Sequence, residues 1–367
     1  MSLKCGIIGI TNTGKTTILN CVSNTKAEAT SFAFSTNKSN MGVINVPDPR
    51  LDQINKFVNS KKVTPTTVDI VDIPGLAKGS SEGEGVGNQF LADIQQTNAL
   101  IHVLRCFDDE NLPHVEGSID PVRDMEIIDL ELQARDLDLV TRKIERLQKV
   151  AKSGDKEAKY GIEVLTKLAD HLEEFGNVRE YEMKKEDKKK LVDDLFLLTD
   201  KPVLYVCNVD EESASGGNAY VEKVKENLAG KDTQVLIVAG ALEADIAELE
   251  TEEERNEFLK DAGLAEPSVN KMIRSAYDLL NLQSFFTAGE KEVRAWTLRK
   301  GSTAPEAAGV IHSDLQRGFI RAEVIAYDDY IAYKGSEAKL REAGKLRLEG
   351  KNYIVKDGDI LNIRFNV

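Results

Sequence analysis

The feature that most constrains the fold of this chain is an eight-residue loop near its N-terminus. Residues Gly9–Thr16, which read Gly-Ile-Thr-Asn-Thr-Gly-Lys-Thr, fit the pattern G-x-x-x-x-G-K-[ST]. The apolar run Leu3–Ile8 precedes the loop and a helical pattern from Thr16 to Val22 follows it, so strand, loop and helix succeed one another. Such a loop turns its backbone N–H groups inward at a helix N-terminus, and it therefore predicts a site for the phosphates of a nucleoside triphosphate.

Individual roles follow from the chemistry of this loop. Lys15 is expected to reach the β- and γ-phosphates, and the hydroxyl of Thr16 is expected to ligate Mg²⁺. The other residues predicted to bind the nucleotide here are Asn12, Thr13, Gly14 and Thr17.

A second segment supplies candidates for the metal and the γ-phosphate. Asp72-Ile73-Pro74-Gly75 follows the apolar run Thr67–Val71, which places a carboxylate at a strand end beside the phosphate loop. We expect Asp72 to hold Mg²⁺, and Gly75 to offer its N–H to the γ-phosphate because no side chain blocks the approach. Thr36 is the candidate threonine that closes over Mg²⁺ when a γ-phosphate is present.

The residue after Gly75 bears on the rate of hydrolysis. GTPases of the Ras type use a glutamine near this turn to orient the attacking water, but this chain has Leu76. Another group or a partner must then position the water, so we expect hydrolysis without a partner to be slow.

The choice of base is expected after the apolar run Pro202–Cys207. Asn208-Val209-Asp210-Glu211 stands where guanine-specific proteins have Asn-Lys-x-Asp. The final aspartate of that signature accepts hydrogen bonds from guanine donors that adenine does not present there. Glu211 is longer by one methylene and Val209 removes the lysine stem, which favours ATP or dual use of ATP and GTP.

Apolar runs alternate with helical stretches through the first 127 residues and again after about residue 199, which indicates an α/β domain with a mainly parallel sheet. Between them, two apolar stripes at helical spacing predict an antiparallel helical hairpin that breaks at Ser153-Gly154-Asp155. It could be a partner-binding arm or a cap that only completes a core. The stripe residues are Leu130, Ala134, Leu137, Val140, Ile144 and Leu147, then Ile162, Leu165, Leu168, Leu172 and Phe175.

The last 80 or so residues change character, with short strand candidates broken by glycines, and predict a small, mostly β module. The expected strands there are Val293–Leu298, Phe319–Ala326, Lys345–Leu348, Tyr353–Val355 and Ile360–Phe365. The expected domains are therefore 1–127 with 199–282 for the nucleotide, 128–198 for the inserted helices and 283–367 for the C-terminal module.

Composition limits the class of protein. No run of about 18 apolar residues and no signal-peptide pattern is present, so we expect a cytoplasmic protein without a membrane partner. Four well-separated cysteines predict buried, reduced thiols. The net charge of −14 argues against binding nucleic acid by charge alone, but from Ser284 onward there are 14 Lys and Arg against 12 Asp and Glu, so an anionic partner is expected at the C-terminal part.

Together these motifs resemble the YchF/Obg-like ATPase family over essentially the whole chain. The segments that carry the resemblance are Gly9–Thr16, Val46–Asp52, Asp72–Leu91, Ile101–Phe107, Asn208–Glu211 and the stretch from Phe286 to Trp296. The resemblance implies a P-loop nucleotide domain, an inserted helical coiled coil and a small β-grasp-like C-terminal TGS domain. It also implies ATP preferred over GTP, ribosomes or ribosomal RNA as partners through the helical arm and TGS domain, and a role in translation or stress response. We expect the chain to be a monomer.

The resemblance assigns roles to single residues. Asn12 matches an asparagine linked with stimulation by K⁺, and His114 matches a histidine proposed to assist hydrolysis, although a histidine in a surface loop is the simpler reading of that position. Ala239-Gly240 stands in place of a Ser-Ala pair near the base. The chain also departs from its relatives before the switch threonine, where Ser31-Phe32-Ala33-Phe34 replaces Asn-Tyr-Pro-Phe.

We consider three functions for a chain with these motifs. The first is a slow ATPase that a partner stimulates, and the second is a ribosome- or RNA-binding module in which the nucleotide is mainly structural; a dual ATP/GTP switch is a variant of the first. The third, a metabolite kinase, needs an acceptor pocket and a basic lid, and the sequence shows neither.

Overall fold

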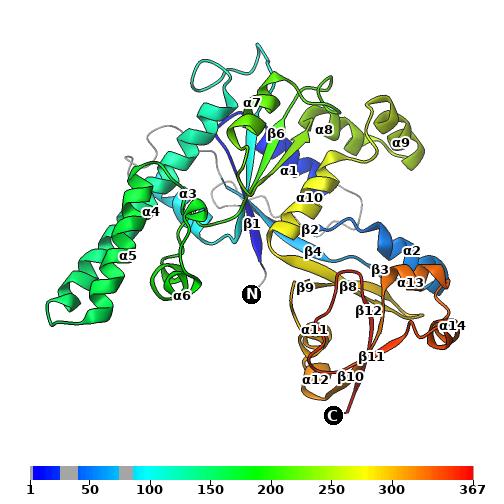
Figure 1. The fold of residues 1–367 in the computed structure, drawn as a ribbon. Coiled ribbons are helices and arrows are strands. Elements are labelled where there is room, and N and C mark those ends of the chain that lie inside the picture. The colour runs from blue at the N-terminus through cyan, green and yellow to red at the C-terminus, as the bar shows by residue number, and fades with distance from the viewer. Residues whose placement is uncertain (1–2, 25–39, 74–85, 367) are drawn as a thin grey trace. The chain divides into compact units, whose positions relative to one another are not determined.

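The computed structural model describes residues 3–24, 40–73 and 86–366 (Figure 1). The chain divides into two compact units, which we call the N-terminal and the C-terminal unit. The N-terminal unit comprises Met1–Gly42 and Asp69–Met272, and the C-terminal unit comprises Val43–Val68 and Ile273–Val367.

A six-stranded sheet in the order β2-β4-β1-β5-β6-β7 forms the centre of the N-terminal unit (Figure 1). β1 pairs in parallel with β4 and β5, and β5, β6 and β7 pair in parallel with one another, so the mainly parallel sheet is confirmed. All seven residues of β5 are buried, as expected for a central strand covered on both faces. The strands are β1 (Lys4–Ile8), β2 (Asn40–Asn45), β4 (Thr67–Asp72), β5 (Ala99–Arg105), β6 (Val203–Asn208) and β7 (Gln234–Val238).

Helices follow the strands as the alternating pattern predicts. Apolar side chains of the sheet and of α3, α4, α7 and α8 share one core. Four cysteines, Cys5, Cys21, Cys106 and Cys207, are buried and form no disulfide, which confirms the expected thiols. The helices outside the hairpin are α1 (Lys15–Asn24), α3 (Val86–Gln95), α7 (Ala219–Asn227), α8 (Gly240–Glu248) and α9 (Glu252–Asp261). A further helix, α10 (Ser268–Leu279), begins in this unit and passes into the C-terminal unit at Ile273.

The predicted hairpin consists of α4 (Pro121–Ala151) and α5 (Lys156–Glu173), which lie side by side in Figure 1. At 1.5 Å per residue, α4 is about 46 Å long. Both helices begin at an aspartate whose side chain accepts backbone N–H groups, Asp120 for α4 and Asp155 for α5. Four short helical turns then lead back to the sheet: η1 (Val178–Glu180), α6 (Lys185–Asp187), η2 (Lys188–Val192) and η3 (Asp193–Leu195).

The apolar stripes of the hairpin are only partly buried. Val140, Leu165 and Leu168 form the centre of the core between the helices and are fully buried. Leu130 and Phe175, expected in the same stripes, are instead 44% and 72% exposed. Leu130 lies in the first half of α4, and Phe175 follows the last residue of α5 by two positions.

The C-terminal unit contains a second six-stranded sheet, in the order β11-β10-β12-β8-β9-β3. Adjacent side chains of β8 point to opposite faces: Phe285 packs in a core with α11, whereas Phe286 packs in a core with α2, α13 and α14. Both faces of the sheet are therefore covered by helices. The elements are α2 (Pro49–Val58), β3 (Val63–Thr64), β8 (Leu282–Ala288), β9 (Val293–Arg299), α11 (Ala304–Ile311), α12 (Ser313–Arg317), β10 (Phe319–Ile325), α13 (Tyr327–Ala332), α14 (Glu337–Glu342), β11 (Arg347–Glu349) and β12 (Ile360–Phe365).

The structure corrects three expectations about this unit. It is mixed α and β rather than mostly β, and Tyr353–Val355 is no strand, since only Ile354 forms an isolated bridge, to Thr303. The segment Val43–Val68, expected in the nucleotide domain, groups with the C-terminal residues. The physical reason is α2, whose apolar residues Leu51 and Ile54 belong to the same buried cluster as Phe286.

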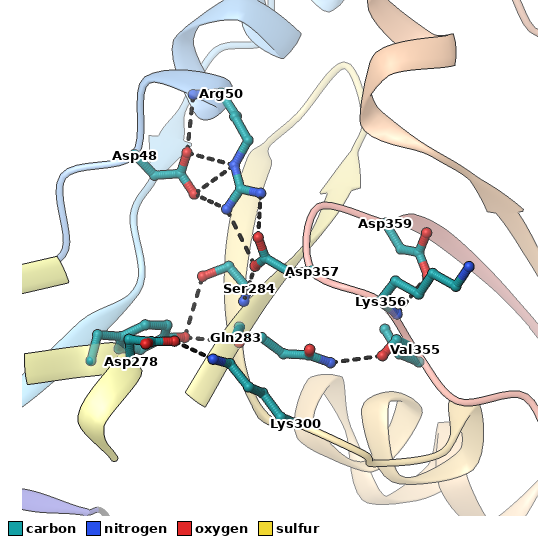
Figure 2. Close-up of polar contacts among 11 residues, drawn as sticks. Asp48, Arg50, Asp278, Gln283, Ser284, Lys300, Val355, Lys356, Asp357 and Asp359 are labelled. Carbon is teal, nitrogen blue, oxygen red and sulfur yellow. Dashed lines mark hydrogen bonds and ion pairs between the residues drawn. The ribbon is translucent and has the colours of Figure 1, made fainter. Parts of the chain in front are cut away.

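Charge contacts also fix α2 in this unit, and Figure 2 shows them. Arg50 donates through Nη2 to Asp48 Oδ2 at 2.8 Å and through Nη1 to Asp357 Oδ2 at 2.7 Å. Its guanidinium lies 5.2 Å from the centroid of the Phe286 ring. Asp357 Oδ1 in turn accepts the backbone N–H of Ser284 at 3.0 Å. We call Asp48, Arg50, Ser284, Phe286 and Asp357 the Arg50 cluster.

Among the described residues, no helix is long and apolar enough to cross a membrane.

Candidate nucleotide-binding site

The conformation of the phosphate loop depends on glycines at two positions. Gly9 and Gly14 have φ of 152° and 87°. A Cβ on Gly9 would lie 2.5 Å from the carbonyl oxygen of Val103, and a Cβ on Gly14 would lie 2.2 Å from Asn208 Nδ2. Any side chain at Gly14 would therefore be strained and would collide with a neighbour.

Lys15 begins α1 and is 8% exposed. Its Nζ donates to the carbonyl oxygens of Gly9 at 3.0 Å and Ile10 at 2.6 Å, so the ammonium lies inside the curve of the loop. Burial lowers the pKa of Lys15 to about 8, although the carboxylate of Asp72 opposes this shift. A buried cation that holds only neutral carbonyl oxygens would gain most from an anionic oxygen at this place.

Asp72 is the last residue of β4 and stands beside Ile7 of β1 in the register of the sheet. Burial raises the pKa of this carboxyl group, and Lys15 opposes the rise. The hydroxyl-bearing Thr16 and Thr17 lie exposed in the first turn of α1. A carboxylate and a hydroxyl are the hard oxygen ligands that Mg²⁺ prefers, so these residues fit the ion.

The described residues contain no cluster of three His, Cys, Asp or Glu side chains that could hold a metal by themselves. Thr36 and Gly75, expected beside the metal and the γ-phosphate, lie outside the described residues, as does Leu76.

Asn208 connects the two sides of the site. Its Nδ2 donates to the carbonyl oxygen of Thr13 at 2.9 Å, and its Oδ1 accepts the N–H of Gly240 at 2.9 Å. Thr13 is itself held, since its hydroxyl donates to the Ile10 carbonyl oxygen at 3.2 Å. The structure therefore gives Asn208 a bracing role between the phosphate loop and the start of α8.

The other residues expected near the base differ in exposure. Val209 and Ala239 are 3% and 1% exposed and belong to the core of the unit. Glu211 is exposed to solvent. The Val209 side chain is thus directed into the core and offers a base no cover of the kind a lysine stem gives.

The loop from Phe107 to Asp120 contacts the phosphate loop through Asn12. Asn12 has φ of 64° and donates through Nδ2 to the carbonyl oxygen of Pro113 at 3.1 Å. The next residue, His114, has both ring nitrogens occupied: Nε2 lies 2.9 Å from Asp124 Oδ2, and Nδ1 accepts the N–H of Glu116 at 3.1 Å. The Asp124 side chain is 1% exposed. In this arrangement the ring of His114 joins the loop to the first turn of α4.

Sequence reasoning missed the residue that shapes this loop. Arg105, at the end of β5, is 1% exposed, and its guanidinium donates to the carbonyl oxygens of Phe107, Asp109 and Leu112. The available signal was an arginine at the end of a mostly apolar strand, because a buried charge needs several acceptors close by.

Comparisons with known proteins agree with the loop, the sheet and the hairpin. Residues 4–151 match a family model described as "50S ribosome-binding GTPase", and residues 282–366 match the model YchF-GTPase_C, described as "Protein of unknown function (DUF933)". A protein of Escherichia coli O157:H7 named "Ribosome-binding ATPase YchF" is 49% identical over 367 residues, with all of both chains covered. The chain belongs to the YchF family.

Two further relatives show how far this likeness extends. The Bacillus subtilis (strain 168) protein of the same name is 47% identical over 369 residues and is also covered in full. The solved structure titled "Structure of the Schizosaccharomyces pombe YchF GTPase" is 34% identical with a TM-score of 0.86, covering 99% of this chain and 98% of that one. Fold and family are thus settled, while the printed names of these YchF relatives differ between ATPase and GTPase.

Proposed function

We propose that this YchF-family chain is a ribosome-associated ATPase, which binds ATP with Mg²⁺ at the phosphate loop and hydrolyses it slowly to ADP and phosphate. The observation that carries the proposal is the buried Lys15 ammonium, held by the carbonyl oxygens of Gly9 and Ile10 inside a loop whose two glycines pack closely against Val103 and Asn208. The full-length relatives named as ribosome-binding ATPases support the same activity.

The residues of the chain would divide the work as follows. Lys15 exchanges its carbonyl partners for the β- and γ-phosphate oxygens, while backbone N–H groups from Thr13 to Thr16 surround the phosphates. Mg²⁺, when bound, neutralises charge that develops on the phosphates. Thr16 and Asp72 would hold it, joined by Thr36, and Gly75 would donate its N–H to the γ-phosphate.

Slow hydrolysis follows from the absence of a side chain suited to orient water at Leu76. His114 is the candidate for assisting the reaction. In the arrangement described here its ring bonds to Asp124 and Glu116, so such a role needs the loop to release it first. K⁺ bound near Asn12 is the corresponding candidate for stimulation.

The preference for ATP over GTP rests on the altered base signature. Val209 is buried and Glu211 is exposed, and neither supplies the lysine stem or the aspartate that guanine recognition uses. Asn208, Ala239 and Gly240 would line the base end of the site. Dual use of ATP and GTP is the alternative that the same residues leave open.

The partner assignment is also a proposal. The helical hairpin and a TGS domain over residues 283–367 would contact the ribosome or ribosomal RNA, and the chain would act as a cytoplasmic monomer in translation or stress response. The second candidate function, a binding module in which ATP is structural, draws on the many contacts that brace the loop internally.

One experiment tests these statements together. Phosphate release from ATP and from GTP is measured with and without ribosomes and K⁺, for the wild type and for Lys15→Ala. We expect ATP turnover that ribosomes accelerate, and a loss of at least about 100-fold in Lys15→Ala because the phosphates lose their cation.

The matched control is Lys223→Ala, which removes an exposed lysine of α7 and should leave turnover unchanged. A GTP affinity tenfold above that for ATP, about 1.4 kcal/mol, contradicts the base preference. Ribosome association of equal strength with ATP, with ADP and without nucleotide favours the structural role instead.

A further inference from the structure

A cavity of about 430 Å³ lies in the N-terminal unit where the helical hairpin meets the sheet. The first turns of α4 form one wall, and the segments that follow α5 and α7 form the others. No step proposed for the nucleotide uses it.

An amide with an unpaired oxygen lies among the residues that line this cavity. Gln133 lines it and is 5% exposed. Its Nε2 donates to the Phe175 carbonyl oxygen at 3.0 Å and to Asn177 Oδ1 at 2.9 Å, two further lining residues. Its Oε1 is buried and has no hydrogen-bond partner among the residues the structure describes. Exchanging the oxygen and nitrogen would set an oxygen against two acceptors, so the amide needs an added donor.

Carboxylates give the cavity an excess of negative charge. Asp129 accepts from Asn177 and Arg179, and Glu180 pairs with Lys231 at 3.0 Å. Glu126 is exposed at the same cavity, and no ion pair to it is found among the described residues. Glu126 is therefore the carboxylate that remains unpaired after these ion pairs form. The same cavity is lined by Gln133, whose Oε1 lacks a donor.

Apolar side chains complete the lining. Leu130 and Phe175, which the hairpin leaves exposed, both lie at this cavity. Phe175 adopts φ of 62°, a left-handed conformation that non-glycine residues rarely take. An accessible aromatic ring next to carboxylates suits a flat cation, because the face of the ring carries negative charge.

We propose that this cavity binds the guanidinium group of an arginine side chain that a protein partner presents. A guanidinium is planar, carries five N–H donors and stacks on aromatic rings, so one group can donate to Gln133, pair with Glu126 and rest against Phe175. A lysine ammonium is a point charge on a flexible stem and satisfies fewer of these contacts. The inference is independent of nucleotide hydrolysis.

The test uses the full chain with ¹³C-labelled methionine methyl groups. The sequence has five methionines, and Met125 lines the cavity. Titration with a capped Gly-Gly-Arg-Gly-Gly peptide should shift the Met125 methyl signal in a saturable manner. Peptides with lysine or with uncharged citrulline in place of arginine should bind at least threefold more weakly. Equal binding of the lysine or citrulline peptide, or no shift with arginine, overturns the proposal.

Variants separate the cavity from general acidity. Glu126→Gln should weaken the arginine peptide at least threefold, while Glu145→Gln, the same change on an exposed part of α4, should not. Gln133→Leu should remove the preference for arginine over lysine. Because Gln133 is buried and its replacement could affect folding, the paired Glu126 and Glu145 variants decide the question: an equal effect of both reduces the cavity to a diffuse acidic surface and rejects the site.

Discussion

The phosphate loop of the N-terminal unit and the Arg50 cluster of the C-terminal unit are assembled from the chain in opposite ways. The loop is eight consecutive residues whose backbone N–H groups we propose to bind the phosphates, so its chemistry is visible in the sequence. The Arg50 cluster joins residues 307 positions apart, and each of its polar contacts involves at least one side chain. A contiguous site can be recognised by its spacing, whereas a dispersed one depends on the fold that brings its members together.

The chain passes from the N-terminal unit into the C-terminal unit and back again early in the sequence. The segment Val43–Val68 belongs to the C-terminal unit, and in sequence it separates the two candidate metal ligands Thr36 and Asp72. The nucleotide site and the Arg50 cluster are therefore linked by short stretches of covalent chain on both sides of this segment. If they are nevertheless independent structural elements, damage to one should leave the other intact.

The largest effect is expected from Gly14→Ala. Its methyl group would meet Asn208 Nδ2, and φ of 87° disfavours any side chain. We expect ATP affinity to fall at least about 100-fold, roughly 2.7 kcal/mol, because the loop must open to admit the group. Isothermal titration calorimetry with ATP measures the affinity of the wild type and of Gly14→Ala.

Gly154→Ala is the matched control for Gly14→Ala. Gly154 has a similar φ of 90° but nothing within 4 Å of an added Cβ. It should lower stability by about 1 kcal/mol through backbone strain and leave ATP affinity unchanged. Equal losses of affinity in both variants would show that close packing at Gly14 is unimportant.

The next largest effect is expected from Arg50→Ala in the C-terminal unit. The variant leaves the Asp48 carboxylate, whose side chain is 9% exposed, without its ion pair and removes the contact with Phe286. We expect a loss of about 2 kcal/mol in the free energy of unfolding of this unit. Trp296, the one tryptophan of the chain, lies in β9, so its fluorescence during urea unfolding reports on the C-terminal unit.

ATP affinity of Arg50→Ala should stay within about twofold of the wild type if the two regions are independent. Arg321→Ala, at an exposed arginine of β10, is the control and should change stability by less than about 0.5 kcal/mol. If Arg50→Ala lowers both stability and ATP affinity and Arg321→Ala lowers neither, the two regions are coupled through the segment Val43–Val68 and are not independent.

The same contrast explains what the sequence could and could not predict. The parallel sheet and the hairpin were predictable because β5 is mostly apolar and the stripes of α4 and α5 repeat at helical spacing. The position of α2 in the C-terminal unit could not be predicted. Leu51 and Ile54 show that the helix has an apolar face, but not which element that face packs against. β8 escaped prediction for a similar reason: both of its faces are buried, so Leu282–Phe286 show no alternation.

Within the site, spacing predicted the buried Lys15 and the strand-end Asp72, because both belong to motifs that fix their positions. The bracing of Asn208 between Thr13 and Gly240 could not be predicted, since it depends on how three separate turns meet. The contact of His114 with Asp124 could not be predicted either, because the loop between them has no regular pattern.

The smallest expected effect is a dependence of ATP affinity on pH, which the phosphate loop should show and the Arg50 cluster should not. Burial lowers the pKa of Lys15 to about 8, whereas the pKa of Arg50 is raised by its two aspartates in spite of burial. Phosphates raise the pKa of Lys15 again when they bind. Below pH 8 Lys15 is charged in the free and the bound protein, so ATP affinity should not depend on its titration. Above pH 8 binding must take up a proton, and affinity should fall by up to about tenfold per pH unit.

Calorimetry in two buffers of different ionisation enthalpy detects that proton directly between pH 8 and 9.5. Lys15→Arg keeps a charged group at this position and should lose the pH dependence, whatever its affinity. The urea midpoint of the Trp296 signal should stay constant over the same range, because Arg50 remains charged throughout. If proton uptake persists in Lys15→Arg, the group that titrates is not Lys15. The phosphate loop would then be as insensitive to pH as the Arg50 cluster.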